Sequence, residues 1–472
     1  MSLPNTHFGY DKISAFMGSS PRKIFFSGIG GISMNSLAKV CHARGHEVSG
    51  YDRTPSALTR SLEQMGVKVF YTSSSELVDD AELFVYTVAI PADDPAYVRA
   101  GERGIPRISR ADFLGYIMMG YSSRVGVSGM HGKSTTTALL SSIYTEAGLE
   151  PTVFGGAVMK GAESSDILGA ERAFIFEACE YMDSFLDFYP TTAIVLNIEM
   201  DHVDYFRSMD QIRNSFAAFL KKANTAVVNI ADSDVAEALR LSGTPAVTFG
   251  ESGSGADYTA EDIVFDHGFA SFNIMYKGEH LCRAKLRVPG HHMVTDALAA
   301  TAAAHTDGVD GALIENGLAA YRGIARRMEL VGKSASGADV FDDYAHHPTE
   351  LKNTLEAASE LGYAHTICVF QPHTFSRTAE LLDGFAASLG KSGTDEVILA
   401  PIYPAREVNT YGISSEKLRD AVAEYGMPCK VLDTFEEISD YLTLTLKSGD
   451  AAFVIGAGDV TKVAHMTARD MQ

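Results

Sequence analysis

One segment of the chain, GMHGKS at residues 129–134, carries the residue types that bind phosphate. Glycines let the backbone curl so that its N–H groups converge on phosphate oxygens, and the dipole of the following helix adds to the attraction. Lys133 would reach the terminal phosphates, and the Ser134 hydroxyl would bind Mg²⁺. The full phosphate-loop spacing would place another glycine at position 127, where this chain has Val127. We therefore interpret the segment as a shortened phosphate loop, in preference to a ligand-free turn before a threonine-rich helix.

A second glycine-rich loop, GIGGIS at residues 28–33, follows a predicted strand near the start of the chain. Its first two glycines fit the dinucleotide-binding fingerprint, but Ser33 stands where the third glycine would be. Asp52 follows the next predicted strand, where an acidic residue can bond a ribose or a base. These features indicate a nucleotide or pyrophosphate site, and the motif alone fits a ligand-free turn equally well. By itself, the loop would suggest an NAD-dependent oxidoreductase.

Two carboxylates and a histidine follow two further predicted strands. Glu177 and Glu180 lie at the end of one apolar run, and His202 follows the next. In an open α/β sheet, the carboxyl ends of parallel strands face the ligand crevice. With the Ser134 hydroxyl opposite, a carboxylate and an imidazole at these adjacent strand ends would complete an octahedral Mg²⁺ site.

Two loops in the last third of the chain are dense in polar side chains. The first, DDYAHHPTE at 342–350, holds adjacent histidines, but neighbours on an extended loop point apart, so we do not predict a zinc or iron site there. In the second, QPHTFSR at 371–377, Arg377 would hold a carboxylate through two parallel hydrogen bonds. Upstream of both, RGIARR at 322–327 forms a cationic cluster that would meet phosphate in an otherwise acidic chain.

The elements that must position these residues alternate between strands and helices, which predicts α/β domains with parallel sheets. We predict three such domains, at residues 1–120, 121–332 and 333–472, with GKSASG at 332–337 as the linker before the third. Alternating apolar residues between 257 and 288 predict β-hairpins at the edge of the second domain. The other predicted strands are 23–27, 47–50, 83–90, 124–128, 173–178, 192–197, 339–342, 366–370, 396–400, 428–432 and 451–455, and helices are predicted at 111–119 and 135–147.

Length, charge and cysteine content exclude several classes of protein. The chain has 472 residues, 46% of them hydrophobic, and a formal net charge of −21. It lacks the basic footprint of a nucleic-acid binder and would be repelled by anionic membranes, although backbone N–H groups bind small phosphorylated ligands whatever the net charge. Its five scattered cysteines form no disulfide framework or zinc spacing, and no apolar run is long enough to span a bilayer. We expect a reduced cytoplasmic protein, monomeric or homodimeric, that binds neither nucleic acid nor membrane.

Taken together, the ordered motifs resemble those of the Mur ligases, the ATP-dependent amide-forming enzymes of peptidoglycan synthesis. The likeness runs from about Lys23 to Lys462 and includes GMHGKSTTT, FEACEYMDSFLDFYP, LNIEMDHVDYF, FDDYAHHPTEL, VFQPHTFSRT and IYPAREVNTYGISS. It is strongest to the branch that joins L-alanine to the lactyl carboxylate of UDP-N-acetylmuramate through an acyl phosphate. The resemblance implies a Rossmann-like N-terminal UDP-binding domain, a central P-loop ATPase-like domain with edge β-hairpins, and a Rossmann-like C-terminal domain that binds the amino acid.

The resemblance also implies roles for individual residues, with ATP and Mg²⁺ bound at the central domain. His131 would lie beside the transferred phosphate, and Arg326 or Arg327 would reach the nucleotide as the last domain closes. The implied residues are Gly129, Met130, His131, Gly132, Lys133, Ser134, Thr135, His292, Arg326 and Arg327 for ATP; Gly28, Ile29, Gly30, Gly31 and Asp52 for UDP; Tyr344, His346 and Arg377 for the amino acid and the muramoyl carboxylate; Ser134, Glu177 and His202 for the metal; and Lys133, His131, Glu177 and His202 for catalysis.

One segment departs from the family pattern P-G-x-H-N-x-x-N-A. Here it reads PGHHMVTDA at 289–297, so that His292 is kept while Met293 and Asp296 replace both asparagines. In the family these asparagines serve the adenine side of the ATP site, and neither replacement supplies both an amide donor and a carbonyl acceptor. The sequence therefore does not predict how adenine is contacted or which nucleotide is chosen.

Three alternatives to an L-alanine-adding ligase stay open at this stage. The related recycling ligase joins a tripeptide to the same UDP-sugar, and EACEY at 177–181 partly resembles its EADEY. An NAD-dependent oxidoreductase would use the 28–33 loop but would leave the Gly-Lys-Ser at 132–134 without a role. A non-catalytic UDP-sugar-binding regulator would account for the altered adenine segment.

Overall fold

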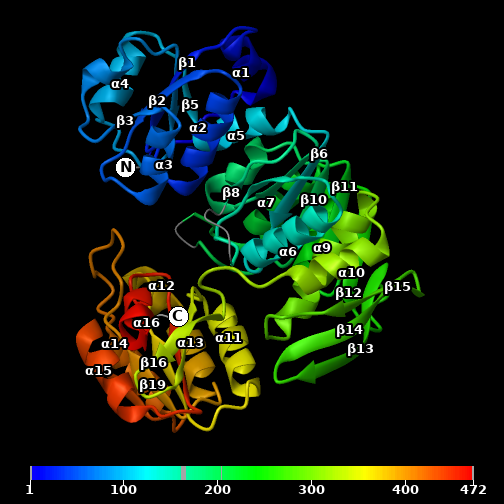
Figure 1. Cartoon of the computed structure of the whole chain (residues 1–472), viewed down its shortest axis with the longest axis vertical. Coiled ribbons are helices and arrows are strands. Elements are labelled where there is room, and N and C mark those ends of the chain that lie inside the picture. Colours follow the sequence, from blue (N-terminus) through cyan, green and yellow to red (C-terminus); the bar gives the residue numbers. More distant parts are fainter. Residues whose placement is uncertain (1–2, 161–165, 203–204, 470–472) are drawn as a thin grey trace.

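The computed structural model describes residues 3–160, 166–202 and 205–469. They form three α/β units that follow one another along the chain, each built on its own sheet (Figure 1). The three-part α/β fold class predicted from the sequence is confirmed. Val203 and Asp204, which belong to the LNIEMDHVDYF motif, lie outside the described residues.

The first sheet is parallel throughout, with the strand order β3-β2-β1-β4-β5. The order reverses between β1 and β4, which places the loop after β1 at the switch point where ligands bind in such sheets. The strand predicted at 83–90 is shorter, because Ile90 donates a hydrogen bond to the Thr87 carbonyl and closes a turn after Tyr86. The elements are β1 (Lys23–Ser27), β2 (Glu47–Tyr51), β3 (Lys68–Phe70), β4 (Leu83–Tyr86) and β5 (Arg107–Ser109), with α1 (Gly9–Met17), α2 (Ile32–Ala43), α3 (Ala57–Gln64), α4 (Pro95–Glu102) and α5 (Arg110–Met118).

The second sheet has the order β15-β14-β13-β12-β11-β10-β6-β9-β7-β8, with the strand that precedes the phosphate loop, β6, near its middle. The strands from β13 to β7 run parallel, and antiparallel hairpins occupy the β13–β15 edge, as the sequence predicted. The strands are β6 (Ser123–Ser128), β7 (Thr152–Phe154), β8 (Asp166–Ile167), β9 (Ala173–Glu177), β10 (Thr192–Val195), β11 (Thr225–Asn229), β12 (Ala246–Glu251), β13 (Tyr258–Asp266), β14 (Phe269–Tyr276) and β15 (Glu279–Lys285). The helices are α6 (Lys133–Glu146), α7 (Met209–Leu220), α8 (Ser233–Ser242), α9 (His292–Thr306) and α10 (Gly311–Ala320).

The third sheet has the order β20-β19-β18-β21-β17-β16-β22. Its strands are β16 (Glu329–Ser334), β17 (Asp339–Asp343), β18 (Thr366–Phe370), β19 (Glu396–Leu399), β20 (Cys429–Val431), β21 (Ala451–Ile455) and β22 (Ala468–Arg469). Its helices are α11 (Pro348–Glu360), α12 (Phe375–Glu380), α13 (Leu382–Gly390), α14 (Ser415–Ala423), α15 (Phe435–Thr445) and α16 (Thr461–Thr467).

The linker predicted at 332–337 is wrong. Gly332 and Ser334 belong to β16, which pairs antiparallel with β17, and Gly337 donates a hydrogen bond to the Ser334 carbonyl in the turn between them. A boundary between residues 332 and 333 would therefore cut a strand. Glycine and serine favour tight hairpin turns as much as linkers, so composition alone did not separate the two. The connection between the second and third units lies upstream, in residues 321–328.

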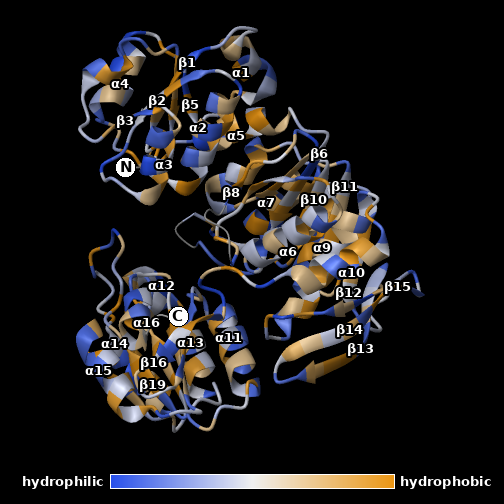
Figure 2. Ribbon diagram, viewed as in Figure 1, coloured by the Kyte–Doolittle hydropathy of each residue, from blue (hydrophilic) through white to orange (hydrophobic). Residues whose placement is uncertain are grey.

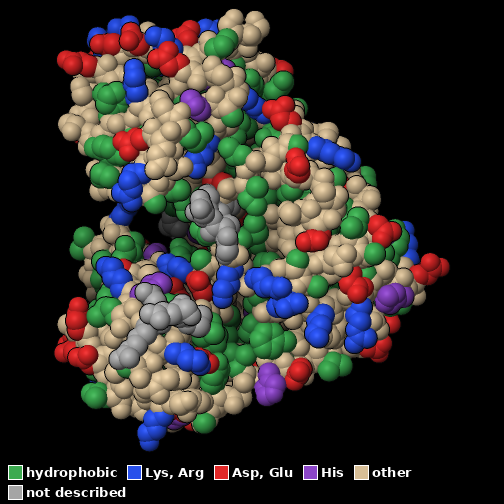
Figure 3. Space-filling model, in the orientation of Figure 1, with side chains coloured by type: hydrophobic (Ala, Val, Ile, Leu, Met, Phe, Trp, Pro, Cys, Tyr) green, Lys and Arg blue, Asp and Glu red, His purple; other side chains and the backbone are tan. Residues whose placement is uncertain are grey.

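Apolar strands covered by helices on both faces form the core of each unit (Figure 2). Every residue of β4, β10, β18 and β21 is buried, as expected for parallel strands covered on both sides. The first and third units leave a hollow between them, and the second unit lies beside it (Figure 3). Within the described ranges, no helix has the length and apolar character needed to cross a membrane.

Candidate active site

The phosphate loop leaves the carboxyl end of β6 and enters α6 at Lys133. Its turn requires glycine, because Gly129 and Gly132 have φ values of +141° and +83°. Asn197 fixes the loop from the end of β10, since its Oδ1 accepts from the His131 N–H at 2.9 Å and its Nδ2 donates to the His131 carbonyl at 3.1 Å. Among the described residues no side chain caps α6 at Gly132, which leaves its first N–H groups facing an anion site.

Lys133 and Glu180 form a buried ion pair at the base of this loop. Nζ lies 3.2 Å from Glu180 Oε2 and also donates to the Met130 carbonyl at 3.1 Å. His202 Nε2 lies 3.2 Å from the other oxygen of the same carboxylate. Burial opposes the charge of Lys133, but Glu180 and, to a smaller extent, the neighbouring Cys179 and Glu177 together outweigh burial and raise the pKa of the lysine. Burial likewise opposes the charge of Glu180, yet Lys133 and His202 hold its pKa below the usual range.

The predicted metal ligands are only partly brought together. Glu177 accepts a hydrogen bond at 2.5 Å from the Gly156 N–H, and its charge contributes to the raised pKa of Lys133. No hydrogen bond or ion pair joins Ser134, Glu177 and His202 to one another in the described part of the chain. The residue that contacts both Lys133 and His202 is Glu180, which the sequence placed at the same strand end without giving it a role. Metal binding by Ser134, Glu177 and His202 stays a prediction.

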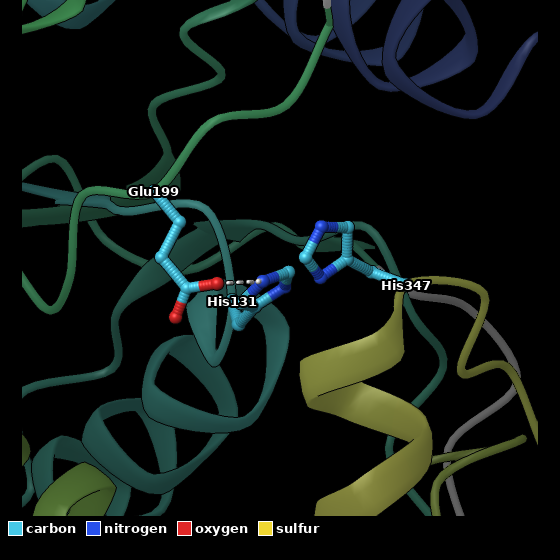
Figure 4. A group of neighbouring side chains, drawn as sticks. All are labelled: His131, Glu199 and His347. Carbon is cyan, nitrogen blue, oxygen red and sulfur yellow. Dashed lines mark ion pairs between the residues drawn. The ribbon is translucent and has the colours of Figure 1, made fainter. Parts of the chain in front are cut away.

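His131 lies at the contact between the second and third units (Figure 4). Its Nε2 is 3.6 Å from Glu199 and its Nδ1 is 3.5 Å from Glu350, while its ring centroid is 4.7 Å from that of His347. Burial opposes the charge of this imidazole, but the two carboxylates outweigh burial and raise the pKa of His131 to about 9. Ligand atoms of His131, Glu199 and His347 lie within 4.8 Å of one another, as in a metal site. The distances of 3.6 and 3.5 Å from the His131 nitrogens to the two carboxylates suit ion pairs, and we interpret His131, Glu199 and Glu350 as an ion-pair cluster.

Further contacts join the segment after β10 to the third unit. Thr349 Oγ1 donates to Glu199 Oε2 at 2.9 Å, and Arg377 Nη2 donates to Asp201 Oδ1 at 3.3 Å. Burial opposes the ionisation of Asp201, but Arg377 together with His202 outweighs burial and holds the pKa of this carboxyl below its usual range. The third unit is therefore docked on the phosphate-loop side of the second.

The two arginines of the connection have different environments. Arg326 has a positive φ of 58°, donates to the Gly456 carbonyl at 2.5 Å and lies over the Tyr344 ring. Arg327 donates to Glu350 Oε1 at 3.3 Å and lines a cavity beside the phosphate loop. Of the two arginines predicted to reach the nucleotide, Arg327 lines this cavity, whereas Arg326 is held within the third unit.

The cavity beside the phosphate loop measures about 200 Å³. Its polar end is formed by residues of the loop and of the start of α6. Its other walls come from α9, from strand ends of the second and third units, from α11 and from the connection between the units. Predicted ATP-binding residues that line it are His131, Gly132, Ser134, Thr135, His292 and Arg327, and Met293, Asp296 and Tyr321 complete the inner end.

A second cavity lies between the segment after β10 and the third unit. It is lined by His202, His373 and Arg377, with Asp201 and Glu407 among the other polar groups. Burial lowers the pKa of His373 to about 4, so this imidazole is neutral near pH 7. Arg377 and His202, predicted to serve different parts of the reaction, thus share one pocket.

The other two predicted substrate residues lie outside that pocket lining. Burial lowers the pKa of His346 to about 4, and its Nδ1 faces the Tyr344 carbonyl at 3.0 Å. The Tyr344 ring is 37% exposed and carries Arg326 over its face at 4.8 Å. The His346 ring centroid lies 5.9 Å from that of His373, which lines the pocket that contains Arg377.

The N-terminal glycine loop is built around Asp52. Gly28 has a φ of +87°, and Asp52 Oδ2 accepts from the Gly30 N–H at 2.9 Å, so this carboxylate fixes the loop with one of its oxygens. Sequence reasoning missed Arg110, which follows β5 and donates to Ser33 Oγ at 3.3 Å at the start of α2. Its position directly after a strand of a parallel sheet was a signal that could have revealed it. A cation beside an uncapped helix N-terminus is suited to a pyrophosphate.

These features define a three-unit α/β nucleotide-binding protein in which the third unit docks beside the phosphate loop of the second. Family models match residues 23–122 (Mur ligase family, catalytic domain), 127–304 (Mur ligase middle domain) and 326–458 (Mur ligase, glutamate ligase domain). The chain belongs to the Mur ligase family, as its motifs predicted.

Curated relatives and solved structures give a more detailed similarity. The chain is 40% identical over 454 residues to the UDP-N-acetylmuramate–L-alanine ligase of Clostridium novyi, covering 96% of this chain and 98% of the relative. It is 42% identical over 455 residues to the enzyme of the same name from Acetivibrio thermocellus, covering 96% of each. The solved UDP-N-acetylmuramate–alanine ligase of Thermotoga maritima superposes with a TM-score of 0.79 at 26% identity, covering 94% of this chain and 97% of that one. A murein peptide ligase from Psychrobacter arcticus, with a TM-score of 0.69 at 24% identity and coverage of 94% and 97%, shares the fold.

Proposed function

We propose that the chain is an ATP-dependent ligase that joins the lactyl carboxylate of UDP-N-acetylmuramate to the amine of L-alanine, with Mg²⁺ as cofactor. The observation that carries this proposal is the docking of the Arg377 pocket against the phosphate-loop unit, through Arg377–Asp201 and His131–Glu350. A nucleotide site and an anion-binding pocket that meet at one interface suit a reaction between a phosphate donor and a carboxylate. The high identity to L-alanine-adding relatives supports this branch over the tripeptide-recycling one.

The chemistry has two steps. An oxygen of the lactyl carboxylate attacks the γ-phosphorus of ATP, the bond to the β-phosphate oxygen breaks, and ADP leaves. The amine nitrogen then attacks the acyl phosphate carbon, phosphate leaves, and the nitrogen loses a proton. The protein must hold anionic reactants in line and stabilise the charge that moves between them. The loop N–H groups and Lys133 supply that stabilisation at the phosphates, and His131, which carries a proton near pH 7, adds a positive charge beside the loop.

The residues at the strand ends suit a magnesium ion by their chemistry. Ser134 and Glu177 offer hard oxygen donors and His202 an imidazole, next to a second carboxylate on Glu180. Mg²⁺ bound there would supply charge neutralisation for the ATP phosphates. Glu180 keeps Lys133 and His202 in position through its two oxygens.

The remaining substrate groups have candidate partners in the first and third units. Arg377 would hold a carboxylate through its planar fork, and the neutral His373 beside it can accept a proton. The uncapped start of α2, with Arg110 next to it, would hold the UDP pyrophosphate. We propose a cytoplasmic location for these reactions.

A substrate panel tests the proposal. The chain is incubated with ATP, Mg²⁺ and UDP-N-acetylmuramate plus L-alanine, glycine, L-serine, the tripeptide or no amine, and phosphate release and product mass are measured. We expect release and an amide product with L-alanine. Turnover with the tripeptide alone would assign the chain to the recycling branch instead. Absence of any product, with UDP-sugar binding intact, would favour a non-catalytic regulator, and tight NADH binding without UDP-sugar competition would favour an oxidoreductase.

A further inference from the structure

A cationic pocket lies at the β-hairpin edge of the second unit. It measures about 750 Å³ and is formed by the hairpin strands, the segment after β7 and the start of the connection to the third unit. Lys and Arg side chains gather on the side of the second unit that carries these hairpins (Figure 3). The basic side chains that line the pocket are Lys160, Lys285, Arg287 and Arg322.

The alternation of side chains along the hairpin places two of these cations on one face. Lys285, at the end of β15, pairs with Ser271 of β14, and both residues line the pocket. Arg287 lies two residues further on and is exposed like Lys285, whereas the intervening Leu286 is 2% exposed. The next residue, Val288, lines the cavity beside the phosphate loop instead. The cationic pocket is therefore a different cavity from the one predicted to hold the nucleotide.

The two arginines of the pocket are fixed by one backbone carbonyl. Arg287 Nε donates to the Ala319 carbonyl at 2.9 Å, and Arg322 Nη1 donates to the same oxygen at 3.1 Å. Ala319 lies in the last turn of α10, where carbonyls lack helical partners and attract cations. A guanidinium has five N–H donors, so a single bond to this carbonyl leaves most of them for a ligand. Because the side chains are already held in place, a ligand loses less free energy in ordering them.

The positive charges of this pocket are not neutralised by the chain itself. Within the ranges that the structure describes, no ion pair involves any of its four basic side chains. Asp266 is the only carboxylate among the described residues of the lining, so three positive charges remain in excess. This excess occurs in a chain whose formal net charge is −21. Cations gathered in this way repel one another, and a bound anion would remove the repulsion.

We propose that this pocket binds a small anion that carries two or more phosphate groups. One phosphate monoester has about 1.5 to 2 negative charges at pH 7, which is too few to balance an excess of three, whereas a diphosphate supplies enough. The planar forks of Arg287 and Arg322 match phosphate oxygens, and the two lysines add point charges. The cavity volume suits a small molecule, and the acidity of the whole chain opposes a nucleic-acid polymer. The site lies outside the proposed ligase centre, and its assignment does not depend on the proposed function.

The test is calorimetric titration of the full chain with inorganic pyrophosphate, for wild type, Arg287→Gln and Lys285→Gln. The phosphate loop also attracts phosphates, but its contribution is common to all three proteins, so the differences between them report on the pocket. We expect each variant to weaken pyrophosphate binding at this site at least about tenfold, because it loses a charged hydrogen bond to the ligand. Arg287→Gln also loses the bond to Ala319, whereas no hydrogen bond of the Lys285 side chain occurs in the described part of the chain. A loss in Lys285→Gln therefore reports on binding without altering the end of α10.

The matched control is Arg283→Gln, which removes an exposed cation from the same strand but outside the pocket lining. We expect this variant to bind pyrophosphate as wild type does, since salt at about 0.15 M screens charges separated by more than about 8 Å. An equal loss in Arg283→Gln would indicate diffuse attraction, and unchanged binding in both pocket variants would indicate no site, so either result overturns the proposal. Orthophosphate that binds as tightly as pyrophosphate would reject the requirement for two phosphates. Binding of polyglutamate but not of pyrophosphate would assign the pocket to an acidic protein partner instead.

Discussion

Lys133 Nζ lies 3.2 Å from Glu180 Oε2, and Glu180 is 1% exposed. The lysine of the phosphate loop is therefore held by a carboxylate from the end of β9 as well as by its own loop carbonyls. A buried charge of each sign stabilises the other only while both are present, because either one alone bears the full cost of leaving water. The pair thus links the stability of the second unit to the geometry of its phosphate site.

Replacing Lys133 with alanine should remove turnover while preserving UDP-sugar binding. The variant loses the cation that faces the transferred phosphate, for which we expect a loss in kcat of at least about 10²-fold. The first unit, which contains the predicted UDP-binding loop, is unchanged in this variant. Phosphate release and equilibrium binding of UDP-N-acetylmuramate measure the two effects. Lys352→Ala, an exposed lysine on α11, is the control, and wild-type turnover of Lys133→Ala would remove the phosphate-loop assignment.

Glu180→Gln and Glu177→Gln should separate a structural carboxylate from a metal-binding one. Without the Glu180 charge, the largely buried Lys133 keeps only its loop carbonyls as partners, and we expect the free energy of unfolding to fall by about 1.5–3 kcal/mol. Glu177 is only partly buried and bonds a backbone N–H, so its amide variant should unfold nearly as wild type does. It should instead need more Mg²⁺ for half-maximal turnover. Thermal unfolding and a Mg²⁺ titration of activity measure these effects, and an unchanged Mg²⁺ requirement in Glu177→Gln would reject its role as a ligand.

Arg377→Lys should raise KM for L-alanine more than it lowers kcat. Lysine keeps the charge but loses the planar fork that holds a carboxylate through two bonds, which is worth about 1.5–3 kcal/mol, or roughly 10- to 100-fold in KM. Initial rates across L-alanine concentrations measure the split between the two constants. Arg419→Lys, which alters a partly exposed arginine paired with its neighbour Asp420, is the matched variant. A selective loss of kcat would place Arg377 at the reacting atoms instead.

The contact of His131 with Glu199 and Glu350 should weaken as the solution becomes alkaline. The pKa of His131 is about 9 in the folded chain and about 6.5 in an unfolded one. Its raised value means that the charged imidazole stabilises the folded state fully below about pH 6.5, and that this contribution is lost as the pH rises through about 9. We expect the difference in Tm between wild type and His131→Asn to shrink between these pH values. The exposed control is His280→Asn. A Tm difference for His131→Asn that stays constant with pH and equals the one for this control would contradict the prediction.

Local sequence predicted the parts of the site that depend on backbone chemistry. Glycines at 129 and 132 adopt the positive φ values that the loop requires, and the strand, loop and helix occur in the predicted order. The same holds for the loop at 28–33, which follows a strand and opens α2. These features follow from sequence because they depend on the conformations that adjacent residues allow, whatever packs around them.

The tertiary structure decided which side chains meet. Glu177 ends β9 and Glu180 follows three residues later, yet of the two Glu180 contacts Lys133, because the direction of a side chain at a strand end depends on the turn that follows. Likewise, the adjacent Arg326 and Arg327 have different hydrogen-bond partners. Arg326, whose φ is positive, donates to the Gly456 carbonyl, whereas Arg327 donates to Glu350. The cluster around His131 joins two units far apart in the chain, so no local pattern could reveal it. Sequence predicts where phosphate would bind, and tertiary packing, within the second unit and between units, decided which charged side chains lie beside that loop.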